Sequence, residues 1–284
     1  MKLFRTLFLS TAALLIGGLT GAVRAETLDC TPITSLPYVI TTQGIYCLTG
    51  NLSTSMTSGR AIDIQTNNVT IDLNGYKLGG LGAGDGTTAF GIYAYQRKNI
   101  TIKNGIVRGF DRGIWLNDAS PYTASAGNTV KNILADQNTY TGIDVRGLGN
   151  TVENSKVVDT GGSTAHTLGA YGIMVGGSGA KIVNNDVSTT TIASNYNVDG
   201  IFLFSADCSL VQNNTVTNTV TLGTGNTFSI LRQDSEGVFV RDNNLGYSYY
   251  GLYFSNSTGK YLNNLTFHVG ITFTGGTAVG SNNY

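Results

Sequence analysis

A four-residue pattern of glycine, an apolar residue, any residue and a second apolar residue recurs along most of the chain. Clear copies begin at Gly91, Gly113, Gly142, Gly172, Gly200 and Gly251. Successive glycines are 22, 29, 30, 28 and 51 residues apart, and the last interval fits two repeats, with Thr227-Phe228-Ser229-Ile230 in the gap. Weaker copies begin at Ala61 and Gly270. A fixed period of about 20–50 residues predicts a solenoid, in which each repeat is one coil stacked on the next.

A second column follows in the strand-like segment after each copy. It ends in Asn or Asp, at Asn104, Asn132, Asn154, Asn185, Asn213, Asp242 and Asn264. Stacked asparagines can hydrogen-bond along the axis of a stack of strands, and Asn also tolerates the left-handed backbone of a sharp turn. The two columns together predict an all-β solenoid of short parallel strands with an asparagine ladder. A stacked jelly roll or a propeller is the competing architecture, but neither predicts two columns in step.

The composition supports this fold class and bears on partners. The chain has 38 Gly, 3 Pro and only 12% charged residues, which suits short strands and tight turns. Its 17 basic and 17 acidic residues give no net charge, and the basic residues form no run. We therefore expect no nucleic-acid partner, because that binding needs clustered Lys and Arg.

The N-terminal residues 1–25 have the features of a secretory signal peptide. Lys2 and Arg5 precede an apolar run from Leu7 to Leu19, and Val23-Arg24-Ala25 forms a small-residue cleavage site. We expect cleavage near Ala25 and a secreted or periplasmic protein. No later segment is apolar enough over a sufficient length for a transmembrane helix.

Three cysteines follow the predicted signal peptide. Cys30 and Cys47 lie near the new N-terminus, and an oxidising compartment favours their pairing within a cap at residues 26–55. The alternative is a pair of buried free thiols. Cys208 lies in a strand-like run of the remaining region, 56–284, and is expected to be a small core residue.

Both repeat columns resemble those of the pectate-lyase-like superfamily over roughly residues 55–275. The resemblance implies a right-handed parallel β-helix with three parallel sheets, an interior of stacked Ile, Val and Leu, and an N-terminal cap. It implies little about activity, because one fold hosts many functions.

Side chains between the inward apolar residues of the glycine-containing strands should point outward and stack from turn to turn. The first such column is Asp63, Tyr93, Trp115, Asp144, Met174, Phe202, Ser229 and Tyr253, and the second is Gln65, Tyr95, Asn117, Arg146, Gly176, Phe204, Leu231 and Ser255. Flat aromatic rings beside a few polar groups suit sugar rings. We therefore predict a polysaccharide-binding face formed by Tyr93, Tyr95, Trp115, Asn117, Phe202 and Tyr253. The alternative is that long loops cover these rings.

One short segment, Tyr140-Thr141-Gly142-Ile143-Asp144-Val145-Arg146, resembles the Tyr-Gly-Phe-Asp-Pro-His strand of the mannuronan C5-epimerase and alginate-lyase group. An Arg stands where that group has His, and the Tyr is displaced by one residue. The resemblance implies catalytic roles for Tyr140, Asp144 and Arg146. Arg146 would neutralise a uronate carboxylate, and Tyr140 or His166 would exchange the ring proton. The alternative is that Asp144 and Arg146 form a surface ion pair.

Other chemistries find less support in the residues. Asn197-Val198-Asp199-Gly200 resembles one motif of polygalacturonase-type hydrolases, but the remaining motifs of that class are missing. No spacing of Cys and His is typical of a metal site, so no metal and no cofactor are expected. The sequence thus predicts an exported protein that binds a polysaccharide, an acidic one if Arg146 takes part, with or without lyase or epimerase activity. A non-catalytic structural or adhesive protein of the cell envelope is the alternative.

Overall fold

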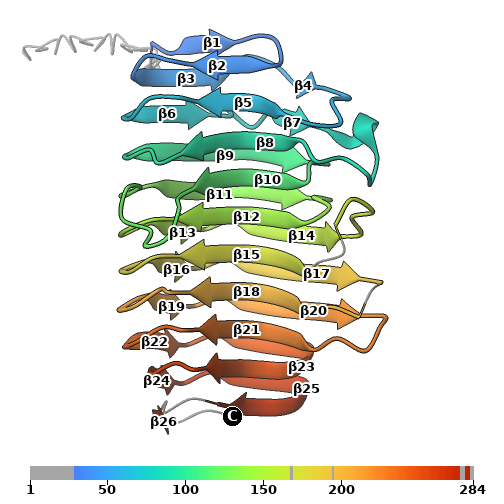
Figure 1. Ribbon diagram of the computed structural model, residues 1–284, viewed down its shortest axis with the longest axis vertical. Coiled ribbons are helices and arrows are strands. Elements are labelled where there is room, and N and C mark those ends of the chain that lie inside the picture. The colour runs from blue at the N-terminus through green and yellow to red at the C-terminus, as the bar shows by residue number, and fades with distance from the viewer. Residues whose placement is uncertain (1–28, 167–168, 194, 276–278, 282–284) are drawn as a thin grey trace, which may run out of the picture.

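The computed structural model describes residues 29–166, 169–193, 195–275 and 279–281. Within these residues the chain coils into a tall stack of parallel strands, with its early strands at one end and its late strands at the other (Figure 1). The predicted signal peptide at 1–25 lies outside the described residues. In the described part of the chain, no helix has the length and apolar character needed to cross a membrane.

The strands form three parallel sheets along the stack, as the repeats predicted. The first sheet contains β2 (Tyr38–Ile40), β5 (Arg60–Ile64), β8 (Phe90–Tyr95), β10 (Arg112–Asn117), β12 (Thr141–Arg146), β15 (Ala170–Gly176), β18 (Val198–Phe204), β21 (Thr227–Gln233) and the second halves of β23 (Asn244–Ser255) and β25 (Leu265–Thr274).

The second sheet contains β1 (Thr31–Ile33), β3 (Gly44–Leu48), β6 (Val69–Asp72), the first halves of β9 (Ile100–Arg108) and β11 (Thr129–Asp136), β13 (Thr151–Glu153), β16 (Lys181–Val183), β19 (Leu210–Gln212), β22 (Val238–Arg241), β24 (Gly259–Leu262) and β26 (Val279–Ser281). The third contains β4 (Leu52–Ser53), β7 (Lys77–Gly79), β14 (Lys156–Gly161), β17 (Asp186–Ile192), β20 (Thr215–Thr221) and the remaining halves of β9, β11, β23 and β25. A single turn of 3-10 helix, η1 (Leu81–Ala83), interrupts the described strands.

The apolar residue after each repeat glycine forms the central column of the core. Its members are fully buried and stack in register: Ile62, Ile92, Ile114, Ile143, Ile173, Ile201, Ile230 and Leu252. The glycines are required because the third sheet packs against them. A Cβ atom on Gly172 would lie 2.4 Å from Cγ1 of Val187, and one on Gly200 would lie 2.2 Å from Cγ1 of Val216. No side chain fits at such distances, so the glycine column follows from the close packing of two sheets.

The asparagine ladder is present, with one correction to its register. The buried ladder is formed by Asn185, Asn214, Asn243 and Asn264. The main-chain N–H and side-chain Nδ2 of Asn214 both donate to Oδ1 of Asn243, at 2.9 and 3.0 Å, and Asn185 and Asn243 repeat this pattern. The other residues assigned to the column, Asn104, Asn132, Asn154, Asn213 and Asp242, occupy the adjacent left-handed corner, with φ between 49° and 60°. In four turns, two consecutive Asn or Asp residues stand at this corner, and only the second residue of each pair is buried.

One inward column contains an unexpected charge. Leu116, Val145, Val175 and Leu203 are followed in register by Arg232 and then by Phe254. Arg232 is fully buried, its guanidinium lies 4.2 Å from the centre of the Phe254 ring, and Nη2 donates to the carbonyls of Ser235 and Thr258. Burial lowers the pKa of Arg232 to about 10. Carbonyl oxygens and an aromatic face therefore hold a cation where the repeat has aliphatic residues.

The cysteines agree with the sequence analysis in part. Cys30 and Cys47 form a disulfide that links the start of the described chain to β3. Cys208 is not a core residue: it is exposed and lies at a turn with a left-handed φ of 53°. The expectation of burial was wrong because the apolar run Ile201–Ala206 ends before this turn.

Candidate functional site

The outward face of the first sheet carries three columns of side chains rather than the two expected. The additional column lies one residue before the repeat glycine and contains Arg60, Phe90, Arg112, Thr141, Tyr171, Asp199, Phe228 and Tyr250. The sequence analysis missed it because it considered the residues after the glycine alone. This column supplies the second arginine of the site described below.

One turn also has a different register from the expected one. Leu231, not Ser229, lies beside Phe202, and Gln233, not Leu231, lies beside Phe204. Ser229 occupies the place of the missing glycine and is fully buried. This repeat lacks the glycine that marks the register in the other turns. Its apolar residues could therefore be aligned with the neighbouring strand in two ways from the sequence alone.

Asp144 is at the centre of the candidate site. Its side chain is fully buried, although it lies on the outward side of β12. Arg146 makes a two-point contact with it, from Nε to Oδ1 at 2.9 Å and from Nη2 to Oδ2 at 2.8 Å. Arg112, one turn earlier on β10, donates from Nη1 to the same Oδ2 at 2.8 Å. A carboxylate with two guanidinium partners is held firmly in place.

Both arginines keep part of their binding capacity. Among the described residues, Nη2 of Arg112 and Nη1 of Arg146 have no hydrogen-bond partner, and both atoms reach solvent. Asp144 interacts with both guanidinium groups, and a second carboxylate, that of Asp111, lies 3.9 Å from Nε of Arg112. The group still presents unpaired guanidinium N–H donors at the surface, and such donors recognise an anion.

Aromatic rings surround this group. The guanidinium of Arg112 lies 3.9 Å from the centre of the Trp115 ring and 4.9 Å from that of Tyr140. Arg146 lies between Trp115, at 5.8 Å, and Phe204, at 5.3 Å. The three residues predicted from the Tyr140–Arg146 segment, Tyr140, Asp144 and Arg146, thus form one cluster with Trp115, which was predicted from the aromatic column.

The other predicted binding residues lie along the same face but differ in exposure. Tyr93 packs edge-on against Trp115 at 5.2 Å and is only 6% exposed. Tyr95 is 42% exposed, and Asn117 lies beside it in register and is half-buried. Phe202 stacks on Tyr171, and Tyr253 packs on Phe228 and Tyr250 several turns further along the stack. Trp115, Phe202 and Tyr253 are half-buried, since these rings cover one another.

A histidine and an acid adjoin the arginine pair. Nε2 of His166 lies 2.8 Å from Oδ1 of Asp111, which is buried, although the two are not aligned as a hydrogen bond. The imidazole also lies 4.7 Å from the Tyr140 ring, measured between ring centres. Burial raises the pKa of Asp111, and the nearby His166 and Arg112 partly oppose this rise. Burial likewise raises the pKa of Tyr140, so its hydroxyl keeps its proton at neutral pH.

Asp199 is a second buried acid on this face. It is 1% exposed, and its Oδ1 has no hydrogen-bond partner among the described residues. It follows Tyr171 in the additional column and lies three turns beyond Arg112. Burial raises the pKa of Asp199 well above its usual value.

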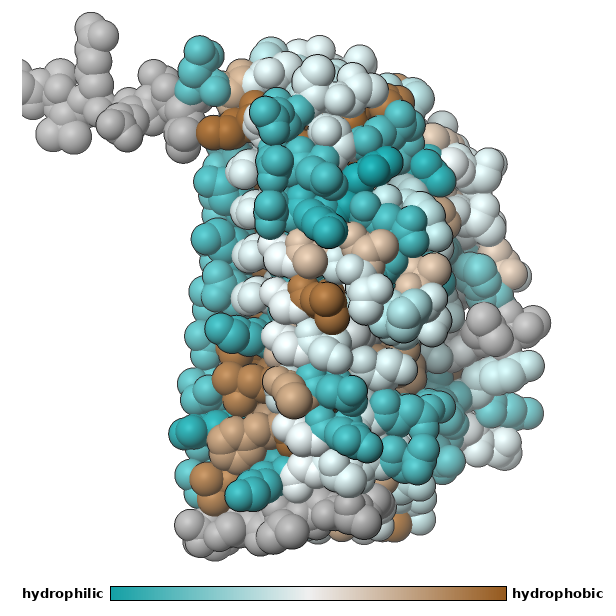
Figure 2. All heavy atoms as spheres, turned by 60° about the vertical axis from the view of Figure 1, so that its left-hand side comes forward, coloured by the Kyte–Doolittle hydropathy of each residue, from teal (hydrophilic) through white to brown (hydrophobic). Residues whose placement is uncertain are grey.

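The surrounding surface is mostly polar. Figure 2 shows the side that lies at the left of Figure 1, with hydrophobic residues limited to a few groups that lie mainly in the C-terminal half. Among the described residues, no three His, Cys, Asp or Glu side chains cluster in a way that would hold a metal ion.

Comparison with known proteins agrees with this architecture. A family model described as "Right handed beta helix region" matches residues 38–187. A search of curated proteins found no match. Solved structures with a similar fold include the enzymatically active domain of bacteriophage CBA120 tailspike protein 2, at 15% identity and a TM-score of 0.61, covering 86% of this chain and 39% of that one.

Two further structures extend the likeness. The A-module of Azotobacter vinelandii mannuronan C-5 epimerase AlgE4 is 12% identical, with a TM-score of 0.58 over 89% of this chain and 86% of the module. The Dettilon tailspike protein is 15% identical, with a TM-score of 0.59 over 90% of this chain and 59% of that one. This chain therefore spans well under two thirds of either tailspike. At such identities the likeness concerns the fold, and together with the family match it shows that the chain belongs to the right-handed β-helix family.

Proposed function

We propose that the outward face of the first sheet binds an acidic polysaccharide, with a uronate carboxylate at Arg112 and Arg146. The observation that carries the proposal is the sharing of one buried carboxylate, Asp144, by two arginines that each keep a free Nη group. A planar guanidinium with free N–H groups matches a carboxylate in shape and charge. Asp144 fixes both guanidinium groups in advance, which lowers the entropy cost of binding.

The rest of the face suits a polymer of sugars. Trp115, Asn117 and Tyr95 lie beside the arginine pair, and Phe202 and Tyr253 continue the face along the axis of the stack. Aromatic rings can pack on the C–H faces of sugars, while amides and hydroxyls pair with sugar hydroxyls. Among similar folds, the A-module described above is that of an epimerase of mannuronan, and one tailspike domain is described as enzymatically active. The mannuronan epimerase module supports a ligand of this class.

We further propose that the site modifies its ligand by moving the proton next to the uronate carboxyl. Loss of that proton to a base leaves negative charge on the carboxylate, which Arg112 and Arg146 stabilise. In this proposal His166, which lies 2.8 Å from Asp111, takes the proton, and Tyr140, whose ring lies 4.7 Å from the imidazole, gives one. The raised pKa of Tyr140 suits a proton donor better than a base. Return of a proton to the opposite face of the ring gives epimerisation, whereas protonation and departure of the neighbouring glycosidic oxygen gives a lyase product.

The proposal includes export. A disulfide between Cys30 and Cys47 persists in an oxidising compartment, which the apolar N-terminal segment is suited to reach. We place the protein in the periplasm or outside the cell.

A non-catalytic structural or adhesive role is the second candidate. The observation that favours it is the packing of the rings on one another, with Tyr93 and Met174 each only 6% exposed. In that case the rings would stabilise the outer face of the stack rather than bind a sugar.

Calorimetric titration with hexamannuronate tests the proposal, with Arg241→Ala as the matched control because Arg241 lies on the second sheet and pairs with Asp242. We expect Arg146→Ala to weaken binding at least about tenfold, as for truncation of an anchoring arginine. Arg241→Ala should bind as the wild type does. Absorbance of the unsaturated product reports lyase activity, and NMR of the sugar reports epimerisation. Failure of the wild type to bind hexamannuronate and related uronate oligomers would support the structural role.

A further inference from the structure

We propose that the protein has a second, independent sugar-binding pocket for an uncharged oligosaccharide, at the corner between the third and first sheets. The pocket encloses about 640 Å³ and is lined by Thr219, Val220, Thr221, Gly223, Thr224, Gly225, Asn226, Thr227, Tyr247, Ser248, Tyr249, Tyr250, His268 and Gly270. Its volume falls within the range of ligand pockets, ~300–1,000 Å³. The arginine pair around Asp144 contributes no residue to it.

The pocket forms where two successive turns differ in length. Residues 222–226 connect β20 to β21 as a loop, whereas β23 and β25 pass from the third sheet to the first without a break. The loop therefore projects beyond the turns that follow it and leaves a hollow beneath. The loop is also tied to the preceding turn, since the N–H groups of Thr224 and Asn226 donate to the side chains of Asn195 and Asn197 at 3.0 and 3.1 Å. These hydrogen bonds hold the loop in place over the hollow.

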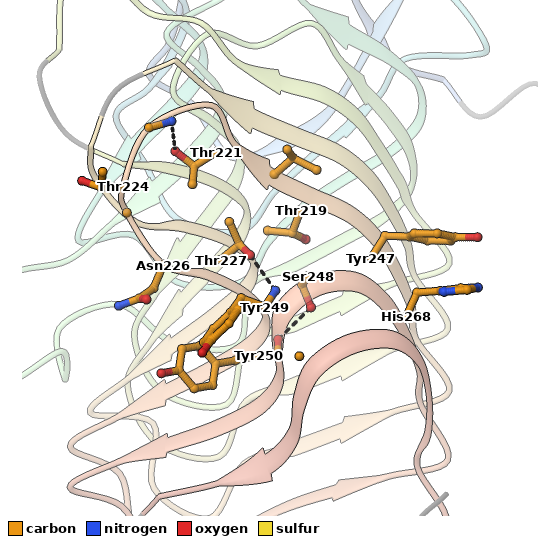
Figure 3. A pocket seen from close by; sticks show the side chains of 14 residues that line it. Thr219, Thr221, Thr224, Asn226, Thr227, Tyr247, Ser248, Tyr249, Tyr250 and His268 are labelled. Atoms are coloured by element: carbon orange, nitrogen blue, oxygen red, sulfur yellow. Dashed lines mark hydrogen bonds between the residues drawn. The ribbon is translucent and has the colours of Figure 1, made fainter.

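The aromatic residues of the pocket are exposed, in contrast to those around Asp144. Tyr247 is 48% exposed and Tyr249 is 53% exposed. The Tyr247 ring stacks on the His268 imidazole at 4.9 Å with an interplanar angle of 16°, which holds it in place. Tyr249 is held edge-on against Tyr250 at 4.8 Å. In Figure 3 Tyr247 and His268 project side by side at one edge of the pocket, while Tyr249 and Tyr250 lie together at another. Exposed rings held by their neighbours bind with little loss of entropy.

The polar groups of the pocket are mostly hydroxyls. Its lining contains hydroxyl groups, one amide and the imidazole of His268, and no Asp, Glu, Lys or Arg. Among the described residues, the side chains of Thr224 and Asn226 and the hydroxyls of Tyr247 and Tyr249 have no hydrogen-bond partner. Thr224 and Asn226 lie on the loop, on the same side of the pocket as Tyr249 and Tyr250, whereas Tyr247 lies at the other side (Figure 3). Hydroxyl and amide groups together with exposed aromatic rings match the hydroxyls and C–H faces of an uncharged sugar.

The sequence segments around the pocket also lack charged residues. No charged residue occurs between Asp207 and Arg232 or between Asp242 and Lys260. An acidic sugar placed here would lose part of its hydration without gaining a Lys or Arg partner. The two sites therefore select different ligands: an acidic residue at the arginine pair and a neutral one at this pocket. This inference does not rest on the function proposed above.

Calorimetric titration with maltohexaose, cellohexaose and hexamannuronate tests the inference. We expect the wild type to bind at least one of the neutral hexaoses, and Tyr247→Ala and Tyr249→Ala to weaken that binding at least about tenfold each. Tyr76→Ala is the matched control, because Tyr76 is also exposed, at 37%, and lies outside the pocket. The melting temperature of all three variants should stay close to that of the wild type, because exposed rings contribute little to the core.

The two proposals fail separately. Arg146→Ala should leave binding of the neutral hexaose unchanged, and Tyr247→Ala should leave binding of hexamannuronate unchanged. If the wild type binds neither neutral hexaose, or if Tyr247→Ala and Tyr249→Ala bind it as well as Tyr76→Ala does, the second pocket is not a sugar site. If both sets of variants weaken both ligands, there is one continuous site rather than two.

Discussion

Arg112 reaches from one turn of the solenoid to the next and places its Nη1 2.8 Å from Oδ2 of the fully buried Asp144. Arg146 occupies the other side of the same carboxylate. The three charges form one unit, because each arginine depends on Asp144 for neutralisation and Asp144 depends on both for its burial.

Asp144→Asn should therefore destabilise the protein, since it leaves Arg146 without its carboxylate partner and Arg112 with only Asp111, 3.9 Å from its Nε. We expect a loss of about 2–4 kcal/mol in the free energy of unfolding, somewhat below the ~3–5 kcal/mol of a fully buried pair because both arginines reach solvent. Urea unfolding measures this change. A loss below about 0.5 kcal/mol would mean that the three charges do not act as a unit.

The two adjacent asparagine columns should respond differently to substitution. Asn214→Ala removes a buried amide that donates to Asn243 and Ile182 and accepts from Asn185, so we expect a loss of about 2–4 kcal/mol. Asn213→Gly should cost less than about 0.5 kcal/mol, because Asn213 is exposed and glycine readily adopts its φ of 55°. Thermal melts of the two variants compare the columns directly. Similar losses would contradict the register of the ladder.

Asp199 should make stability depend on pH. Its pKa is raised well above its usual value in the folded protein, so the unfolded chain releases this proton at lower pH than the folded one does. The protonated Asp199 carboxyl contributes fully to stability below its pKa in the unfolded chain. This contribution is lost as the pH rises through its pKa in the folded protein. Asp199→Asn cannot ionise, and we expect it to be more stable than the wild type at pH 7–8 by about 1–3 kcal/mol, the usual penalty of a buried unsatisfied group.

The advantage of Asp199→Asn should vanish near pH 3, where both states of the wild type are protonated at this position. Urea unfolding at several pH values checks the prediction. A variant less stable than the wild type at neutral pH would show that the carboxylate has a favourable partner.

The cysteines differ in accessibility. Cys208 is exposed and should react with a thiol reagent in the native, unreduced protein, whereas Cys30 and Cys47 should not react even after unfolding. Cys30→Ser combined with Cys47→Ser should reduce stability by about 3 kcal/mol on the loop-entropy model, since the two residues are 17 apart. Three reactive thiols in unreduced, unfolded protein would remove the disulfide from the account.

The fold was predictable from the sequence because each turn repeats the same two constraints. Gly172 and Gly200 must be small where the third sheet packs, and Ile173 and Ile201 must be apolar. Where a turn breaks the pattern, the sequence was ambiguous. The segment around Ser229 lacks the glycine, and the pairs of adjacent asparagines did not show which member is buried.

The site was predictable only in part. Asp144 and Arg146 are close in sequence, and their pairing follows from the alternation along a strand. Arg112 was missed because its contact with Asp144 spans a full turn and comes from a column that no motif marked. The burial of Tyr93 could not be predicted from the sequence either. It depends on the packing of Trp115 against the Tyr93 ring and on the guanidinium of Arg60, which lies over that ring.

Trp115 is the only tryptophan of the chain, and it lies 3.9 Å from the guanidinium of Arg112, so its fluorescence reports directly on the arginine pair. The most direct test of the proposed acidic-sugar site is a fluorescence titration of the wild type with hexamannuronate, with maltohexaose in parallel. We expect a saturable change in tryptophan emission with hexamannuronate, weaker at high salt and lost in Arg146→Ala, and no change with maltohexaose. An unchanged emission at saturating hexamannuronate, or an equal change with maltohexaose, would contradict a uronate site at Arg112 and Arg146.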